Sequence, residues 1–183
     1  MFNVFDNKKN METERFLIKK LTSKHANKNY LNWFKDSSVK KYILGAKQKI
    51  NLNYLNKYIR HQNNKRGTLF FGIFNKQDKH LGNIKFDNIS KKKNYVTVGI
   101  LIGNKKYRGI GLAKEVINFF SEFFYKQYKI KNIFLGVNIN NKNAIKAYIK
   151  TGFTHSKNLD HTGGIYMVKK YKIIKKIQTR KVN

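Results

Sequence analysis

The stretch that decides the fold reads Lys106-Tyr107-Arg108-Gly109-Ile110-Gly111-Leu112-Ala113. It follows an apolar run over residues 96–102 that is typical of a strand, and it opens a long segment with apolar residues at helical spacing. Two glycines in such a turn let the backbone approach a ligand closely. Because the first N–H groups of a helix have no acceptor within the helix, this turn can bind a phosphate group.

Two familiar glycine-rich phosphate sites fit this turn poorly. A Rossmann dinucleotide site expects an acidic residue about 20 residues onward, at the end of the next strand. Here the next predicted strand ends in Asn138, with no acidic residue nearby. A P-loop requires Gly-Lys followed by Ser or Thr, which the turn lacks. A turn whose glycines serve only tight packing remains the alternative.

Composition predicts one soluble, cytoplasmic domain. The chain has 183 residues, 40% of them hydrophobic, which is enough for one core. No apolar run approaches the ~20 residues of a membrane span, and residues 1–10 lack the apolar centre of a signal peptide. The absence of Cys excludes disulfides, thiolate metal sites and a Cys nucleophile. We expect a single domain over residues 1–183, with a loose leader (1–12), a basic tail (175–183), no metal and no membrane association.

The formal net charge of +31 invites a nucleic-acid interpretation. Lysine, however, far outnumbers arginine, which is the residue favoured for bidentate phosphate recognition. Lys, Asn, Ile, Phe and Tyr are all abundant, and their codons are poor in G and C, so base composition explains much of the lysine content. We therefore do not expect nucleic-acid binding as the main role, although a positive field helps capture an anionic coenzyme or substrate.

Periodicity and turn residues predict a strand-rich first half, followed by alternating strands and helices. The Asp36-Ser37-Ser38 sequence is a capping signal before residues 39–43, Gly152 ends the last helix, and Gly163-Gly164 turns between the last two strands. Strands are expected over residues 15–21, 68–74, 80–87, 95–102, 133–137, 153–156 and 165–174, the strand at 133–137 being fully apolar and of the parallel type; helices are expected over residues 24–34, 52–61, 111–128 and 144–150.

A second motif, Asn141-Lys142-Asn143-Ala144-Ile145-Lys146-Ala147-Tyr148, is followed by Thr151-Gly152-Phe153. The two motifs, in this order and separation, resemble those of the GCN5-related N-acetyltransferases. The resemblance covers roughly residues 15–174 and is tightest over 81–153. It implies an α+β, three-layer fold: a mixed, mostly antiparallel twisted sheet with a central, splayed parallel strand pair and flanking helices.

The resemblance also implies acetyl-CoA as co-substrate. Backbone N–H groups of about residues 108–112 would cradle its pyrophosphate, and the strand at 100–102, splayed from its parallel neighbour, would receive the pantetheine arm by strand addition. Lys106 stands where relatives usually carry Gln or Arg, and a solvated basic turn is the alternative for Lys106 and Arg108. Asn141 matches a coenzyme-contacting position, and it would also serve as a helix N-cap. The expected coenzyme-binding residues are Ile100, Leu101, Ile102, Lys106, Tyr107, Arg108, Gly109, Ile110, Gly111, Leu112, Ala113, Asn141 and Ala144.

Two residues are the expected catalytic positions. Tyr148 matches the family's tyrosine near the coenzyme sulfur, where a phenol can donate a proton to the departing thiolate; a tyrosine packed in the core is the alternative. Many relatives carry a Glu two residues before the glycine that matches Gly99, but here Thr97 stands there and cannot accept a proton at neutral pH. A water held by Thr97 and backbone carbonyls is therefore the expected base, with His80 and Asp87 as alternatives.

The N-terminal half resembles enzymes that acetylate ribosomal-protein N-termini and nucleotide-linked amino sugars. The resemblance rests on residues 30–34, 36–42 and 81–84, and the run 98–103 with Tyr107-Arg108-Gly109 is most similar to the amino-sugar members. Tyr30, Trp33 and Phe34 lie in the region that shapes the acceptor side in such enzymes, although an apolar helix face packed on the sheet is the favoured single explanation.

We expect direct transfer in a ternary complex to the amine of a nucleotide-linked amino sugar, because no Cys can carry the acetyl group. The N-terminal amine of a ribosomal protein is the alternative acceptor. A polyamine would require acidic pocket walls, which a basic chain disfavours. Two other classes remain open: a non-catalytic basic protein that binds nucleic acid or ribosomes, and an acetyl-CoA-binding module without a base. The chain is expected to be a monomer or a homodimer.

Overall fold

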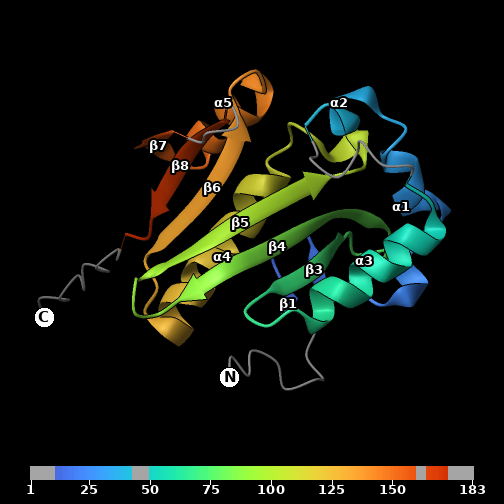
Figure 1. Cartoon of the computed structure of the whole chain (residues 1–183), viewed down its shortest axis with the longest axis horizontal. Helices are drawn as coiled ribbons and strands as arrows, with labels where there is room; N and C mark the ends of the chain where they lie inside the picture. Colours follow the sequence, from blue (N-terminus) through green and yellow to red (C-terminus); the bar gives the residue numbers. More distant parts are fainter. Residues whose placement is uncertain (1–10, 43–49, 160–163, 173–183) are drawn as a thin grey trace, which may run out of the picture.

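The computed structural model describes residues 11–42, 50–159 and 164–172. These residues form an eight-stranded sheet of order β1-β2-β3-β4-β5-β6-β8-β7 (Figure 1). The strands are β1 (Met11–Glu12), β2 (Leu17–Lys20), β3 (Leu69–Phe74), β4 (His80–Ser90), β5 (Tyr95–Ile102), β6 (Asn132–Asn138), β7 (Thr154–Leu159) and β8 (Gly164–Lys170). The helices are η1 (Ser23–His25), α1 (Lys28–Trp33), α2 (Ser37–Lys40), α3 (Leu52–Asn64), η3 (Lys105–Tyr107), α4 (Leu112–Tyr128) and α5 (Lys142–Lys150).

Every neighbouring strand pair is antiparallel except β5 and β6, which are parallel. This confirms the predicted mixed sheet with a parallel pair at its centre. Among the helices of the described ranges, none is long and apolar enough to cross a membrane. Residues 1–10, the basic tail at 175–183 and the glycine turn at Gly163 lie outside the described residues.

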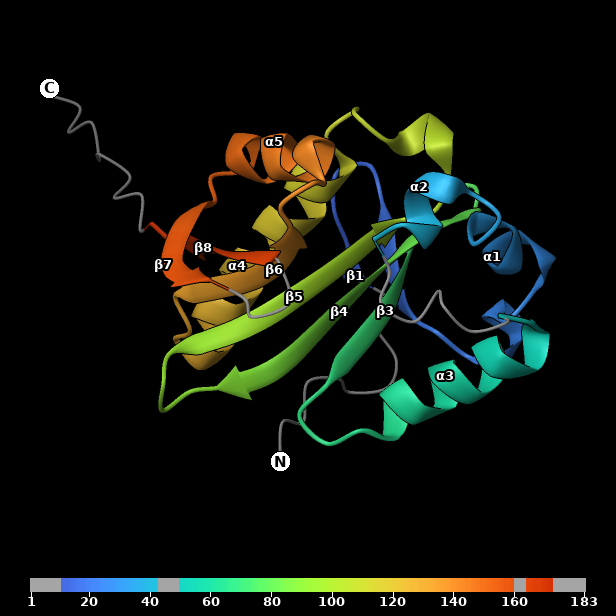
Figure 2. The same ribbon diagram turned by 45° about the horizontal axis from the view of Figure 1, so that its top comes forward.

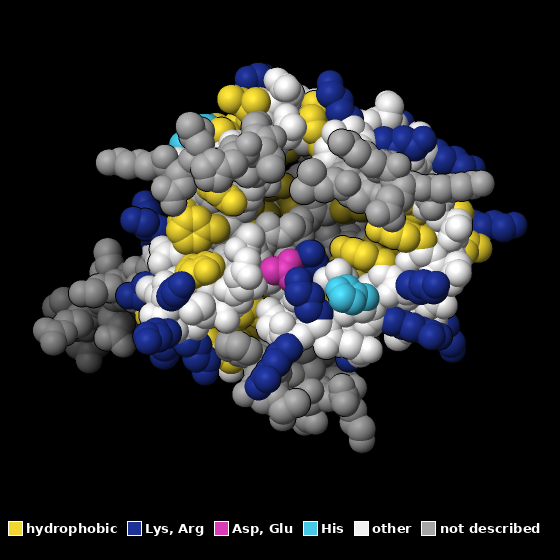
Figure 3. All heavy atoms as spheres, in the orientation of Figure 1, with side chains coloured by type: hydrophobic (Ala, Val, Ile, Leu, Met, Phe, Trp, Pro, Cys, Tyr) yellow, Lys and Arg dark blue, Asp and Glu magenta, His cyan; other side chains and the backbone are white. Residues whose placement is uncertain are grey.

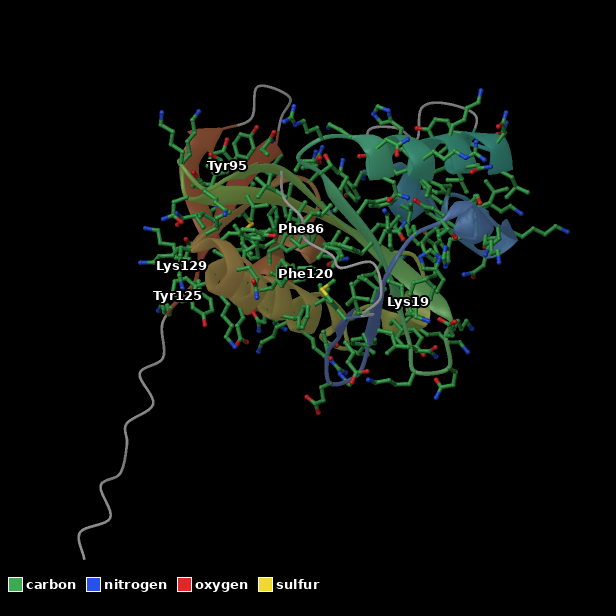
Figure 4. All side chains as sticks on the ribbon, turned by 90° about the horizontal axis from the view of Figure 1, so that it is seen from below. Lys19, Phe86, Tyr95, Phe120, Tyr125 and Lys129 are labelled. Carbon is green, nitrogen blue, oxygen red and sulfur yellow. The ribbon has the colours of Figure 1, made fainter. Side chains whose placement is uncertain are left out.

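The sheet lies between two helical layers, with α4 on one face and α1 and α3 on the other (Figures 2 and 4). The apolar stripe of α4 recurs every fourth position at Leu112, Val116, Phe120 and Phe124, and all four side chains are buried. Phe86 of β4 points toward Phe120, with ring centroids 4.5 Å apart (Figure 4). A second cluster of apolar side chains fills the space under α1 and α3. The two clusters confirm the three-layer fold.

Several element predictions were wrong in detail. Met11 and Glu12, expected in a loose leader, pair with Ile18 and Leu17 as β1. The helix expected over residues 24–34 is divided into η1 and α1, because the Asn27 side chain accepts from Tyr30 N and starts a new helix. The strand at 133–137 is not buried on both faces: alternate residues of β6 are buried, and β6 is antiparallel to β8 along its whole length.

Candidate active site

The centre of the sheet contains a gap between β5 and β6. The two strands pair only through Tyr95–Asn132, Val96–Ile133 and Thr97–Phe134. Beyond Thr97, β5 continues to pair with β4 and β6 with β8, but not with each other. Figure 1 shows the two strands diverging, with α5 following β6 and the glycine-rich turn following β5. Each strand therefore presents a free backbone edge to the gap, which an extended ligand can pair with.

The glycine-rich turn at the end of β5 leaves a row of backbone donors unused. Gly109 has φ 78° and Gly111 has φ 85°, in the left-handed region that glycine adopts without strain. Among the described residues, the backbone N–H groups from Gly109 to Lys114 have no acceptor, and the first N–H of α4 with a partner is that of Glu115, to Gly111. A Cβ at Gly109 would meet no atom within 4 Å, and one at Gly111 would meet only Arg15 Nη2, at 3.5 Å. The turn is thus an open row of N–H groups at the positive end of a helix.

Arg108 supports this turn instead of extending into solvent. Its guanidinium donates to the carbonyls of Ile102 and Gly103, to Asp36 Oδ2 at 2.9 Å and to Ser38 Oγ at 3.1 Å. Burial alone would raise the pKa of Asp36, but the bonds from Ser38 and Arg108 outweigh burial and lower that pKa to about 2. The Arg108 N–H also donates to the carbonyl of Lys105, so the free donors begin at Gly109 and not at Arg108 as expected.

The remaining residues of the first motif divide between packing and exposure. Tyr107 packs its ring edge against Phe16, and its hydroxyl accepts from Asn75 Nδ2 at 3.3 Å. Lys106 is exposed, and its side chain has no partner in the described part of the chain. Ile110 is an exposed apolar side chain beside the glycines. Leu112 is buried under the sheet, so it contributes its backbone but not its side chain to the turn surface.

The second motif forms α5, beyond the end of β6. The Asn141 side chain accepts from Ala144 N at 3.2 Å and caps the helix, as one of its two expected roles requires. Tyr148 is partly buried, and its ring packs edge-on to Phe153 with centroids 5.7 Å apart. Its hydroxyl has no hydrogen-bond partner among the described residues. Burial raises the pKa of Tyr148 to about 12, so the phenol stays protonated at neutral pH and can act as a donor.

The three candidate bases have different surroundings. Thr97 lies where β5 and β6 part, opposite Asp87 in the β4–β5 ladder. Asp87 accepts from Thr68 at 2.7 Å and forms ion pairs with Lys85 at 2.9 Å and Lys65 at 3.6 Å. Burial opposes ionisation of Asp87, but these partners lower its pKa. An ionised carboxylate held in this way is a weak base.

His80 is enclosed by aromatic rings. It is 5% exposed, it stacks on Phe74 at 4.7 Å between centroids, and Trp33 lies at the same centroid distance. Burial lowers the pKa of His80 to about 4, so the ring is neutral at pH 7. Its Nε2 lies 2.8 Å from Asn83 Oδ1. These contacts give His80 a role in packing, away from solvent.

A pocket of about 230 Å³ opens on the face that carries α1 and α3. On this side of the molecule hydrophobic side chains gather toward a hollow, with Lys and Arg around them and an acidic side chain beside Lys or Arg below the hollow (Figure 3). Of the aromatic residues expected on the acceptor side, Tyr30 and Phe34 line the pocket, whereas Trp33 packs against Gly103, where a Cβ would lie 1.8 Å from the indole. The lining comprises Tyr30, Phe34, Ile50, Tyr54, Leu55, Tyr58, Phe70, Asn83, Lys85, Gly99, Ile100 and Leu101.

The parts of this pocket that come from α3 and β4 were not expected from the sequence. Asn83 and Lys85 are two residues apart on one strand and so share a face. This polar alternation could have indicated from the sequence that one face of the strand lines a polar site. Tyr54 and Tyr58, one helical turn apart on α3, give stacked rings. None of the described residues that line the pocket is acidic. Within the described ranges, no three His, Asp or Glu side chains gather as a metal site would require.

Comparisons with known proteins agree with this geometry. A family model described as an acetyltransferase (GNAT) domain matches residues 15–154. A probable spermine N(1)-acetyltransferase of Bacillus subtilis subsp. natto (strain BEST195) is 36% identical over 66 residues, which are 36% of this chain and 43% of the relative. The chain therefore spans less than half the length of the curated relatives it matches.

Two solved structures illustrate the shared fold. The microcin C7 self-immunity acetyltransferase MccE, in complex with acetyl-CoA and AMP, has a TM-score of 0.73 at 18% identity, covering 86% of this chain and 93% of that one. The ribosomal L7/L12 α-N-protein acetyltransferase RimL, in complex with coenzyme A, has a TM-score of 0.70 at 10% identity, covering 86% and 95%. At these identities the likeness establishes the fold.

Proposed function

Because the chain belongs to the acetyltransferase (GNAT) domain family, we propose that it is an N-acetyltransferase that transfers the acetyl group of acetyl-CoA directly to an amine. The observation that carries this proposal is the meeting of two features at one point: the gap between β5 and β6, and the open N–H row from Gly109 to Lys114. A thin, extended arm that is attached to a pyrophosphate fits both.

The N–H row would hold the pyrophosphate of acetyl-CoA. Unpaired helix N–H groups and the positive end of the helix dipole both favour an anion there. The exposed ammonium of Lys106 adds a positive charge beside the turn. The pantetheine arm would then lie along the free edge of β5 over residues 98–102 and pair with its backbone, as an added strand does.

In the transfer, the amine nitrogen attacks the thioester carbon, a C–N bond forms, and the C–S bond breaks as the intermediate collapses. A backbone N–H at the free edge of β5 would stabilise the oxyanion. Tyr148 would supply a proton or a hydrogen bond to the departing sulfur, a role that suits a phenol with a pKa of about 12 and no partner among the described residues.

The amine must lose a proton during the reaction. Since Asp87 is bound to Thr68 and Lys85, and His80 is enclosed, we assign this proton to a water held at Thr97, where the two strands part. Direct attack requires both substrates to be bound together, so the kinetics are expected to be sequential. The chain contains no Cys for an acyl intermediate.

For the acceptor, we propose the amine of a nucleotide-linked amino sugar. The stacked Tyr54 and Tyr58 rings offer a surface for a base or sugar ring, and Lys85 offers a positive charge for a phosphate. The structure of MccE in complex with acetyl-CoA and AMP supports a nucleotide-bearing ligand on this fold. A polyamine is the second candidate, because the curated relative is named for spermine. The lining formed by the described residues contains no acidic side chain, which argues against a polyamine.

Calorimetric titration with acetyl-CoA tests the proposal. Gly111→Val places a side chain on the N–H row and is expected to weaken binding at least about 10-fold, equivalent to about 1.4 kcal/mol. Gly67→Val is the matched control: Gly67 has φ 75° and open space around it, so its backbone strain is similar, but it lies in the turn between α3 and β3. Equal acetyl-CoA affinity in folded Gly111→Val and wild-type protein would refute the proposed coenzyme site.

A further inference from the structure

The pocket contains a buried amide whose donor is unused. Asn83 lies on β4, is 4% exposed and lines the pocket. Its Oδ1 lies 2.8 Å from His80 Nε2, while its Nδ2 is buried and has no hydrogen-bond partner in the described part of the chain. Tyr30 lies nearby, because Asn83 offsets part of the rise in the pKa of Tyr30 that burial causes. The Asn83 amide and the Tyr30 hydroxyl nevertheless do not have the geometry of a hydrogen bond. Because buried donors are almost always paired, this one is available to a ligand.

In the structure, the contact with His80 determines which end of this amide faces the pocket. The His80 ring stacks on Phe74 and is flanked by Trp33 and Tyr30, with centroids 4.7 to 5.6 Å away, so it cannot turn freely. With Oδ1 toward His80 Nε2, the ring nitrogen is the donor and the amide oxygen is the acceptor. The NH₂ group of Asn83 is then the end of the amide that is left without a partner.

A second donor stands next to it on the same face of β4. Lys85 lines the pocket, and its ammonium forms an ion pair with Asp87 at 2.9 Å while its side chain stays 28% exposed. Within the described part of the chain, neither Asp nor Glu lines the pocket. The polar groups that β4 presents to the pocket are therefore both hydrogen-bond donors, which pair with oxygen atoms of a ligand and not with ammonium groups.

We infer that Asn83 is a specificity-determining residue: its NH₂ group donates a hydrogen bond to an oxygen of the acceptor, so the pocket selects amines rich in oxygen, such as amino sugars, over polyamines. The inference rests on the proposed function, because it assigns the pocket to the amine-bearing substrate. A polyamine carries only N–H donors at neutral pH, so it would leave the Asn83 donor unpaired and place its own ammonium groups beside Lys85. A site built to hydrogen-bond its substrate discriminates strongly against a molecule that lacks the matching group.

Selectivity measured by thiol release tests this inference. The amines are a uridine-diphosphate-linked amino sugar with a free amine, a peptide with a free N-terminus, and spermine. Asn83→Asp keeps the shape but replaces the donor with an oxygen, and Asn83→Leu removes the amide. Asn118→Asp is the matched control, because it makes the same change at an exposed position of α4. We expect both Asn83 variants to lower kcat/KM for the preferred oxygen-bearing amine at least about 10-fold, with KM for acetyl-CoA unchanged. The preference over spermine should fall by a similar factor in Asn83→Asp, and Asn118→Asp should behave like wild type.

Several results would overturn the inference, and with it the proposed acceptor, while leaving the proposed acetyl transfer from acetyl-CoA intact. These are a wild-type preference for spermine, an unchanged selectivity ratio in folded Asn83→Asp or Asn83→Leu, or turnover of no oxygen-bearing amine by protein that binds acetyl-CoA. If Asn83→Asp does not fold by circular dichroism, Asn83→Leu and the wild-type ratio decide. Failure of the wild-type protein to bind acetyl-CoA in calorimetry would instead refute the proposed function itself.

Discussion

Replacing Tyr148 by Phe should separate a catalytic tyrosine from a packing one. The change removes a hydroxyl that has no hydrogen-bond partner among the described residues, and it keeps the ring that packs on Phe153. No hydrogen bond between described residues is lost in the folded protein, so the free energy of unfolding should change by less than about 0.5 kcal/mol. Affinity for acetyl-CoA should also be nearly unchanged, since the hydroxyl is assigned to the departing sulfur.

The effect on turnover should be large by comparison. Loss of a positioned proton donor lowers kcat about 10- to 1000-fold, which corresponds to about 1.4 to 4 kcal/mol in the transition state. The pH dependence adds a second signature. Burial raises the pKa of Tyr148 to about 12, so the phenol remains protonated well above the usual tyrosine range. The wild-type rate should therefore show no loss between pH 8 and 10 from deprotonation of this residue, roughly the range in which an unperturbed tyrosine begins to titrate.

Single-turnover thiol release measures the chemical step, and urea denaturation measures stability. Tyr125→Phe is the matched control: Tyr125 is also partly buried and stacks on Tyr171, but it lies near the far end of α4 from the glycine turn (Figure 4). It should leave kcat unchanged. A wild-type single-turnover rate in Tyr148→Phe would refute the assignment and return Tyr148 to a role in packing alone.

Three further outcomes are expected. Burial lowers the pKa of His80 from 6.5 to about 4, so between these pH values the unfolded chain binds more protons and the free energy of unfolding should fall by about 3 kcal/mol as the pH drops. Burial also lowers the pKa of His25, which adds to this pH dependence. Urea denaturation of His80→Gln should show that most of the pH dependence is lost. Arg108→Lys should cost about 1–2 kcal/mol of stability, because an ammonium cannot bond two carbonyls, a carboxylate and a hydroxyl together, whereas Arg60→Lys on the exposed side of α3 should cost nothing measurable in the same assay. Thr97→Val keeps the shape of the side chain but cannot hold a water, so kcat/KM at neutral pH should fall about 10-fold with acetyl-CoA affinity retained; an unchanged pH–rate profile would remove Thr97 from the proton path.

The features that the sequence predicted well are those encoded locally. Gly109 and Gly111 were expected to let the backbone approach a ligand closely, and both have positive φ and nearly open space where a side chain would lie. The apolar residues of α4 recur once per helical turn, so the helix and its buried face follow directly from the spacing. A usable signal was overlooked at Asn27, a good N-cap in the middle of the helix expected over residues 24–34.

The features that escaped prediction depend on residues far apart in the chain. Nothing in the turn around Arg108 shows that its partner is Asp36, 72 positions earlier. The sequence alone therefore does not distinguish an arginine that holds two segments together from one that extends into solvent. The pocket takes its lining from α1, α3, β3, β4 and β5, and no single segment reveals it. The unpartnered amide of Asn83 likewise depends on the rings that hold His80.

The early parting of β5 and β6 changes which part of the sheet is most accessible to water. In an ordinary sheet, amide protons exchange fastest on the outermost strands and slowest in the middle, because central strands are paired on both sides. Here the backbone groups of β5 beyond Thr97 that face β6 have no partner strand, although they lie in the middle of the strand order. This sheet therefore has an internal edge, and amide protons there should exchange faster than those of paired strands farther out. A bound extended molecule would pair with this edge and slow the exchange of its amide protons.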